Sequence, residues 1–463
     1  MPPQKPENDN HSSWFLVCLG VLLLLIFGSV VYIPDSYEHY ILSDCLDGQS
    51  FVDCDHINLG FRPPLMAFFL LPFGFAGVSI LSMISIAGTA TITQKLGKSY
   101  VIWFAFLALF CTHRYPIIAD ARTFLLIFVF GAWIWMMQLS SVRSAILCGI
   151  TIGATMWIRP EAQLGIILFL GTAWFWQRQY FKWLTLGTLC MACGWIGWLS
   201  WHAGQWVWAP RYWEGYMLES WSVMPKRAML QLGGMGLYNP PLREIWLQSP
   251  PMPPKVTPQL HTIFPWFLEV WKQSPLIWLG GILSAPYLYT KKPRIVVLLL
   301  SIGSINVIAA LLPQARDPAF VESNFLLTKS ALVILIALAC SHKHTWLGYL
   351  APLTLMLLDP KPVLEESIES TEVGKQAVAW IAKQETADIP FVSSYESAAI
   401  VWLAKKDWRQ WDDPWHRTPS PKYVLVSNLD VFAVGLPLCT KQKMEVHFSQ
   451  AHTFVSIYSC AVE

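Results

Sequence analysis

Three ionisable residues, Asp35, Glu38 and His39, stand within the segment "PDSYEHY" (34–40), directly after a long apolar run. Asp35 and Glu38 are three residues apart, so on a helical turn their side chains share a face. A carboxylate in such a place can accept a proton from a reacting hydroxyl group. The same residues could instead ligate a cation, or form an ordinary polar collar at the end of the apolar run.

Arginines open or precede several later apolar segments, in the motifs "RPPL" (62–65), "ADART" (119–123) and "IRPEA" (158–162). A guanidinium group beside a helix N-terminus is suited to bind a phosphate, because its fork of N–H donors and the helix dipole both favour an anion. Two ordinary explanations stay open. An arginine can snorkel to the membrane surface, and Arg159 can pair with Glu161.

The segment "DCDHIN" (53–58) could join His39 in a metal site, because it adds Asp and His side chains. Its spacing matches no known ligand frame, and a polar loop explains it more simply. We therefore predict no metal site.

The composition indicates which elements must position these residues. Only 13% of the 463 residues are charged, against about a quarter in a soluble domain, so most of the chain is predicted to lie in a membrane. The net charge of +2, without a basic patch interleaved with aromatic residues, argues against a nucleic-acid partner. The first apolar run is too long for a signal-peptide core and has no small-residue cleavage site, so we expect it to stay as a span.

The fold class that we predict is mainly α, a polytopic bundle of membrane helices followed by a small extracytoplasmic α/β domain. Apolar runs of about 17–25 residues mark membrane helices, and this chain offers about eleven candidates, several of them shorter. They lie at 14–34, 64–93, 99–112, 124–139, 144–158, 162–176, 183–201, 275–290, 295–313, 325–340 and 344–358.

Lys and Arg residues in alternate loops predict the orientation of the bundle. Positively charged loops favour the cytoplasmic side, which places the N-terminus there as well. The intervening loops and the tail after residue 360 then lie outside the cytoplasm. The charged loops are 94–98, 140–143, 177–182, 291–294 and 341–344.

The cysteines agree with this orientation. Six of the ten fall in or at the ends of predicted spans, and the other four all fall in segments predicted to lie outside. Disulfides persist in oxidising compartments, so we expect the pairs Cys45–Cys54 and Cys439–Cys460.

The composition changes after residue 360, so we predict a membrane domain over 1–359 and a soluble domain over 360–463. Helical periodicity marks 372–384 and 396–406 in the second domain. Four short apolar segments read as strands: "PFVSSY", "KYVLVSN", "MEVHFS" and "TFVSIYS".

Taken in order, the acidic pair after the first span, the three arginine motifs and the outer mixed domain resemble a known family. It is the polyprenyl-phosphate-sugar-dependent glycosyltransferases of the C-type membrane fold (glycosyltransferase family 39 type), including protein O-mannosyltransferase-like and lipid A aminoarabinose transferase-like proteins. The resemblance extends over nearly the whole chain and is strongest within 30–165. It departs where that family often opens a late span with an Arg-Tyr pair. This chain has Asn324 and Phe325 there, so Arg316 or Lys329 would have to substitute.

The resemblance implies a transfer of sugar from a polyprenyl-phosphate donor to an acceptor hydroxyl, with inversion and in a single displacement. Asp35 is implied as the general base, while Glu38 would orient the acceptor, hold the loop or bind a cation. Asp120 is the nearest match to a second acidic position of the family, and its role is open. No cofactor is required, and a divalent cation is left open. The donor phosphate is expected to meet Arg62, Arg122, Arg159 and Arg316.

Two other classes of function compete with this interpretation. A transporter or flippase of lipid-linked or small anionic substrates usually shows pseudo-repeated halves and broken helices, which this sequence does not display. A non-catalytic assembly protein or a polymer ligase is the third class. The expected partners are the lipid-linked sugar, membrane lipids and a glycan, lipid or protein acceptor. The expected location is the bacterial inner membrane, with the site and the C-terminal domain outside the cytoplasm.

Overall fold

The fold is described from a computed structural model of the 463-residue chain. The residues that it describes are 10–32, 34–46, 64–74, 76–97, 100–112, 115–159, 162–203, 268, 271–272, 274–310, 325–360, 371–384, 391–393, 398–405, 408–410, 423–427, 442–450 and 453–460.

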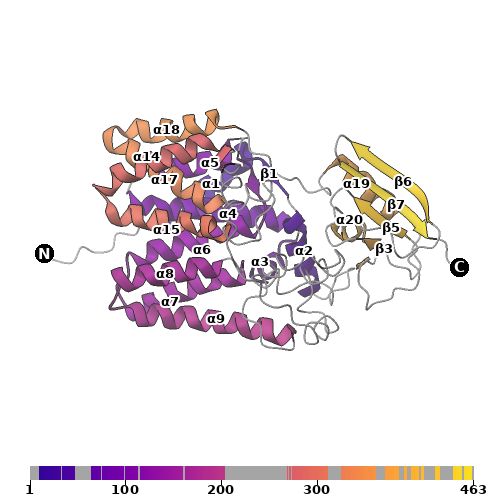
Figure 1. The fold of residues 1–463 in the computed structure, drawn as a ribbon, viewed down its shortest axis with the longest axis horizontal. Helices are drawn as coiled ribbons and strands as arrows, with labels where there is room; N and C mark the ends of the chain where they lie inside the picture. Colours follow the sequence, from indigo (N-terminus) through magenta and orange to yellow (C-terminus); the bar gives the residue numbers. More distant parts are fainter. Residues whose placement is uncertain are drawn as a thin grey trace. The chain divides into compact units, whose positions relative to one another are not determined.

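A helix occupies each of the eleven ranges predicted from the apolar runs (Figure 1). Their bounds agree with the apolar runs within a few residues, except in the first two ranges. The helices are α1 (Asn10–Phe27), α4 (Ala76–Thr93), α5 (Tyr100–Cys111), α6 (Ala121–Met136), α7 (Val142–Ala154), α8 (Ala162–Trp176), α9 (Phe181–Ala203), α14 (Pro275–Tyr289), α15 (Pro293–Ala310), α17 (Leu326–Lys343) and α18 (Thr345–Leu358).

The predicted span 64–93 is two helices rather than one. The short helix α3 (Leu65–Leu70) ends before α4 begins, because Gly74 takes a left-handed conformation with φ of +61°. Its N–H donates to the Leu70 carbonyl at 3.1 Å, which is the usual way for a glycine to terminate a helix. Hydropathy alone misses this break, because the residues around Gly74 are apolar.

The predicted span 14–34 also ends early, at Phe27. A two-residue strand follows, β1 (Val30–Val31), which pairs in parallel with β2 (Ile117–Ile118). The 3₁₀ turns η2 (Gln94–Leu96) and η3 (Thr155–Trp157) extend α4 and α7.

The helix α17 forms the centre of this helical unit. Its residues from Leu327 to Leu338 are buried, and it packs against α5, α14, α15 and α18. Glycines allow other helices to approach closely. A methyl group at Gly149 of α7 would meet the Leu184 carbonyl oxygen at 2.2 Å, and one at Gly187 of α9 would meet the Ile146 carbonyl oxygen at 2.3 Å. This close contact between small residues is typical of helices that pack in membranes.

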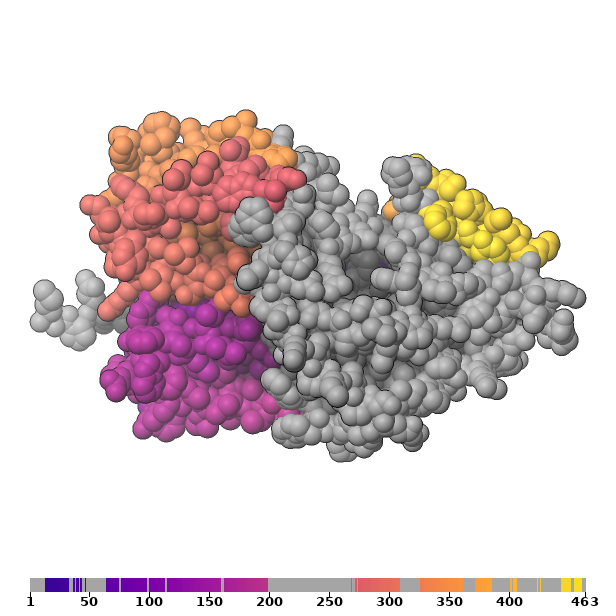
Figure 2. Space-filling model, in the orientation of Figure 1, coloured from indigo at the N-terminus to yellow at the C-terminus, as the bar shows by residue number. Residues whose placement is uncertain are grey.

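Large apolar side chains are exposed on the outer helices of the unit. Examples are Phe15 (65%), Phe175 (81%), Leu283 (65%) and Leu358 (66%). Figure 2 shows one face of this surface, with α7–α9 in magenta and α14 and α15 in red to salmon. So much exposed apolar surface is unfavourable in water and typical of lipid-facing helices. Together with the composition, it indicates a helical membrane protein.

Two helices among the described residues are long and apolar enough to cross a membrane, Ala76–Leu96 and Leu326–Lys343. Both are largely buried inside the bundle. The other helices are shorter or less apolar than that standard, so the number of eleven spans and their orientation stay predictions.

The C-terminal segment forms an α/β fold, as its sequence predicts. A five-stranded sheet has the order β4-β3-β5-β7-β6, in which β3 pairs in parallel with β4 and β5, and β7 pairs antiparallel with β5 and β6. The strand β4 is the one element here that was not predicted, because its sequence "WRQ" is short and polar. The elements are α19 (Glu372–Ala382), α20 (Ala398–Leu403), β3 (Phe391–Ser393), β4 (Trp408–Gln410), β5 (Tyr423–Ser427), β6 (Gln442–Gln450) and β7 (Thr453–Cys460).

The chain divides into two compact units, and each unit contains three segments that are separate in the sequence. The first contains Met1–Val31, Ala76–Trp195 and Pro258–Glu365, and the second contains Tyr32–Phe75, Ile196–Thr257 and Glu366–Glu463. Helix α2 (Pro34–Leu46) and helix α3 therefore belong with the C-terminal fold. The division into domains at residue 359 stays a prediction.

Candidate active site

The two-stranded sheet leads directly into the candidate site. The Ala119 N–H donates to the Val31 carbonyl at 3.0 Å, which extends the pairing of β1 and β2 by one bond. Asp120 follows in an extended conformation, and its carboxylate caps α6 by accepting from the Ala121 N–H. The hydroxyl of Thr123 donates back to the Ile118 carbonyl at 2.6 Å. The segment "ADART" is thus a helix start that two side chains stabilise, Asp120 before the first turn and Thr123 within it.

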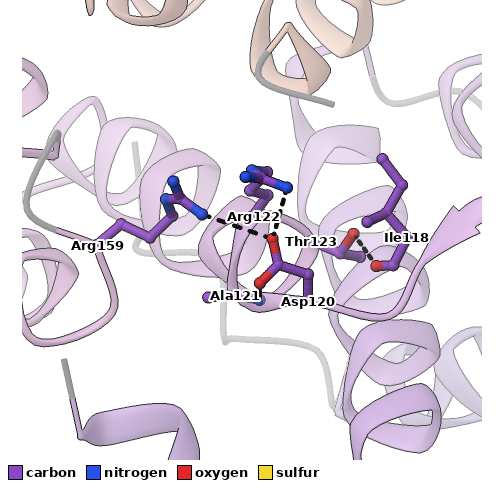
Figure 3. Close-up of polar contacts among 6 residues, drawn as sticks. All are labelled: Ile118, Asp120, Ala121, Arg122, Thr123 and Arg159. Carbon is purple, nitrogen blue, oxygen red and sulfur yellow. Dashed lines mark hydrogen bonds and ion pairs between the residues drawn. The ribbon is translucent and has the colours of Figure 1, made fainter. Parts of the chain in front are cut away.

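Two arginines converge on the Asp120 carboxylate (Figure 3). The Asp120 Oδ2 atom lies 3.2 Å from Nη1 of Arg122 and 3.5 Å from Nη1 of Arg159. The side chains are 0%, 4% and 6% exposed for Asp120, Arg122 and Arg159. We call these three residues the arginine cluster.

Arg122 and Arg159 reach the cluster from different elements. Arg122 is the second residue of α6, whereas Arg159 follows η3 and precedes α8. The backbone around Arg159 is hydrogen-bonded on both sides, from its own N–H to the Thr155 carbonyl at 2.9 Å and from the Ala162 N–H to its carbonyl at 3.1 Å. Since η3 packs against α6 and α8, the turn holds Arg159 beside the start of α6.

The arginine cluster concentrates guanidinium groups in a place shielded from solvent. Two guanidinium groups contact one carboxylate there. A guanidinium group presents a planar fork of N–H donors that matches the oxygens of a phosphate, and such charged hydrogen bonds are stronger where water is excluded. The arrangement is therefore suited to bind a phosphate group.

The structure brings together Arg122 and Arg159, two of the four arginines predicted to meet a phosphate. It places Asp35 and Glu38 near the start of helix α2, while their side chains lie outside the described residues. Arg62 and Arg316 also lie outside the described residues. Their roles, like those of Asp35 and Glu38, stay predictions.

Asp120 is the partner that sequence reasoning left unassigned. The pairing that the sequence suggested for Arg159 was with Glu161, which lies outside the described residues. The structure gives Arg159 an ion pair with Asp120, 39 positions earlier in the chain. Only the motif "ADART" hints at this role, because it puts an acid at the helix start beside an arginine.

Other predicted sites also lie outside the described residues. The segment 53–58, Cys54 and Cys439 are in this group, as are the side chains of Cys45 and Cys460. The two predicted disulfides therefore stay predictions. Six cysteines in the described helices are free thiols: Cys18, Cys111, Cys148, Cys190, Cys193 and Cys340.

Comparisons with known proteins find a likeness in structure. No protein-family model matches the chain, and no curated protein matches its sequence. Among solved structures, the crystal structure of ArnT from Cupriavidus metallidurans bound to undecaprenyl phosphate is similar over 97% of this chain and 98% of that chain. The sequence identity is 11% and the TM-score is 0.41, so this likeness alone assigns neither a family nor a function.

A second buried polar group, not predicted from the sequence, lies in the same helical unit around Asp359. Its carboxylate accepts from the Leu276 N–H at 2.7 Å, the Ile277 N–H at 3.2 Å and the Tyr115 hydroxyl at 3.1 Å. Burial raises the pKa of the Asp359 carboxyl, and these hydrogen bonds together with the charge of Lys329 oppose that rise. Lys329 lies with its Nζ atom 5.0 Å from the centre of the Tyr115 ring. Asp359 thereby joins the end of α18 to the start of α14.

Asp359→Ala is expected to destabilise the helical unit by about 3 kcal/mol or more, because it removes a buried acceptor of three hydrogen bonds and a negative charge that acts on Lys329. The measurement is the melting temperature of the purified protein in detergent. Asp359→Asn keeps one carbonyl acceptor and should lower the melting temperature less than Asp359→Ala does. Adding Lys329→Met to Asp359→Asn should raise the melting temperature again in part, because it removes the buried positive charge. An Asp359→Ala protein that melts with the wild type would contradict this account.

Proposed function

We propose that the chain is an integral membrane glycosyltransferase. It moves a sugar from a polyprenyl-phosphate donor to an acceptor hydroxyl on the periplasmic or lumenal side, by an inverting single displacement. The observation that carries the proposal is the arginine cluster, which holds two guanidinium groups against one buried carboxylate. The order of the sequence motifs supports the same function.

The proposed reaction needs positive charge at the leaving group. As the glycosidic bond breaks, the polyprenyl phosphate leaves as a phosphate monoester and gains negative charge. Donors that are already oriented stabilise such charge at little cost of reorganisation. In this proposal Asp120 holds Arg122 and Arg159 in place, and both contact the phosphate. Arg62 and Arg316 are proposed as further phosphate ligands.

Asp35 is proposed as the base that takes the proton of the acceptor hydroxyl. Glu38, one turn along α2, orients the acceptor, holds the loop or binds a cation.

The acceptor is proposed to be a glycan, a lipid or a protein, and the location to be the bacterial inner membrane. The direct rival is a flippase, because a positively charged cluster also suits the movement of a lipid phosphate. The two functions differ in one respect. A transferase breaks the bond between sugar and phosphate, whereas a flippase moves the lipid intact.

Proteoliposomes that contain the purified protein and defined polyprenyl-phosphate sugars separate these functions. With a membrane extract as the source of acceptor, a transferase converts the donor to free polyprenyl phosphate, which mass spectrometry detects. A flippase makes the donor accessible to a membrane-impermeant reagent and leaves its mass unchanged. Movement without conversion, for every donor tested, would refute the proposed function.

A further inference from the structure

A single hydrophobic core joins helix α2 to the C-terminal α/β fold within the second unit. Helix α2 contributes Tyr37 and Leu42 to it, and α3 contributes Ala67. The remaining buried members come from α19, α20, the turn after α20, and the sheet: Val373, Ala377, Ile381, Ile400, Val401, Ala404, Leu425, Val455 and Ile457. A core that runs from Tyr37 to Ile457 makes α2 a structural part of this fold.

The contact between α2 and the C-terminal fold is tightly packed. Leu42 on α2 and the neighbouring residues Ile400 and Val401 on α20 are each 0% exposed, and Tyr37 is 5% exposed. Helices α2 and α20 pack directly against each other, and α19 packs on both α20 and the strands β6 and β7. Interiors of this kind are close-packed, so a change in volume on α20 is felt by its neighbours.

We propose that the C-terminal α/β fold positions helix α2, and with it the residues Asp35 and Glu38. The positioning residues are Tyr37 and Leu42 on α2 together with Ile400 and Val401 on α20. This inference rests on the proposed function only in giving Asp35 a catalytic role. The coupling of α2 to α20 is independent of that role.

Tyr37 makes the coupling effective, because it lies between Asp35 and Glu38 in the same helical turn. A buried side chain at this point fixes both the rotation and the height of the turn that carries the two acids. A displacement of about 1 Å in a reacting group can cost a factor of about 100 in rate. In this proposal the C-terminal α/β fold acts on the reaction through α2, without contacting the substrate.

A matched pair of substitutions tests the coupling without any assay of activity. Ile400→Val and Ile302→Val each remove one methylene group from a side chain that is 0% exposed, in the shared core and in helix α15 respectively. Hydrogen–deuterium exchange is measured on the full-length protein in nanodiscs. Ile400→Val is expected to speed the exchange of α2 amides about three- to tenfold, whereas Ile302→Val leaves it unchanged.

The same proteins then test the effect on catalysis. Ile400→Val is expected to lower kcat about tenfold with the donor KM within about twofold, since only the reacting group moves. Ile400→Leu, which keeps the volume, should recover most of kcat. The larger deletion Val401→Ala should act in the same direction as Ile400→Val.

The outcomes separate the two proposals. Unchanged α2 exchange in Ile400→Val and Val401→Ala, with faster exchange in α20, overturns the coupling. Faster exchange in α2 with an unchanged kcat overturns the positioning role. A wild-type protein that transfers no sugar from any donor refutes the proposed function, while the exchange data still decide whether the C-terminal domain holds α2.

Discussion

Arg159→Ala and Arg122→Ala are each expected to slow sugar transfer about 10²–10³-fold, because each removes a charged donor that we propose to bind the leaving phosphate. The two guanidinium groups share the Asp120 carboxylate, so removing either one also shifts the carboxylate that holds the other. The effects should therefore be less than additive in the double variant. The measurement is the rate of release of polyprenyl phosphate at saturating acceptor.

Three variants sharpen the test of the arginine cluster. Arg159→Lys keeps the charge but loses the planar fork of donors, so it should recover only part of the rate. Asp120→Asn leaves both cations but weakens their orientation, and is expected to slow transfer by less than Arg159→Ala. Arg178→Ala removes an exposed arginine that stacks on Trp174 in the same unit, and should change the rate by less than about twofold. Wild-type rates in both alanine variants would show that the cluster only stabilises the fold.

Asp35→Asn is expected to lower kcat about 10²–10⁴-fold, because an amide cannot accept the proton of the acceptor hydroxyl. Donor binding should change little, since the proposed phosphate ligands are all arginines. Glu38→Gln should have a smaller effect, which appears mainly in the acceptor KM if Glu38 orients the acceptor. The measurement is steady-state transfer with donor and acceptor varied in turn.

Glu372→Gln provides a matched control for Asp35→Asn. Glu372 is an exposed acid in the first turn of α19, so the substitution removes the same kind of interaction with a helix N-terminus. It is expected to leave kcat unchanged. Full activity in Asp35→Asn would contradict the assignment of Asp35 as the base, even if the arginine variants behave as expected.

The helices could be predicted because long apolar runs specify helices without reference to distant residues. The break at Gly74 was missed because its neighbours are as apolar as the helices on either side. The pairing of β1 with β2 was missed because the residues Val30 and Val31 read as the end of a span. Their hydrogen bonds depend on Ile117, far along the chain, which no local pattern shows.

The site could be predicted in part for the same reason. The motifs "ADART" and "IRPEA" marked Arg122 and Arg159 by their places at helix starts, and the structure brings these arginines together. Their common partner Asp120 depends on how η3 packs against α6, which the sequence does not display. The polar group around Asp359 unites residues from four distant segments, Tyr115, Leu276, Lys329 and Asp359, so no spacing rule could have found it.

The place of α2 in the C-terminal core illustrates a further limit. Composition indicates a change of character after residue 360, which suggests an independent outer domain. Tyr37 and Leu42 show that part of the core of the C-terminal α/β fold comes from helix α2, which follows the first apolar run. An apolar residue in a loop region gives no indication of which distant surface it covers.

The central claim is that this protein breaks the bond between a sugar and a polyprenyl phosphate and passes the sugar to a hydroxyl. The most direct measurement is a mass balance on purified wild-type protein with a defined undecaprenyl-phosphate sugar and an acceptor fraction. We expect equal amounts of free undecaprenyl phosphate and glycosylated acceptor, with the anomeric configuration inverted. Donor recovered intact from every sugar tested would contradict the account.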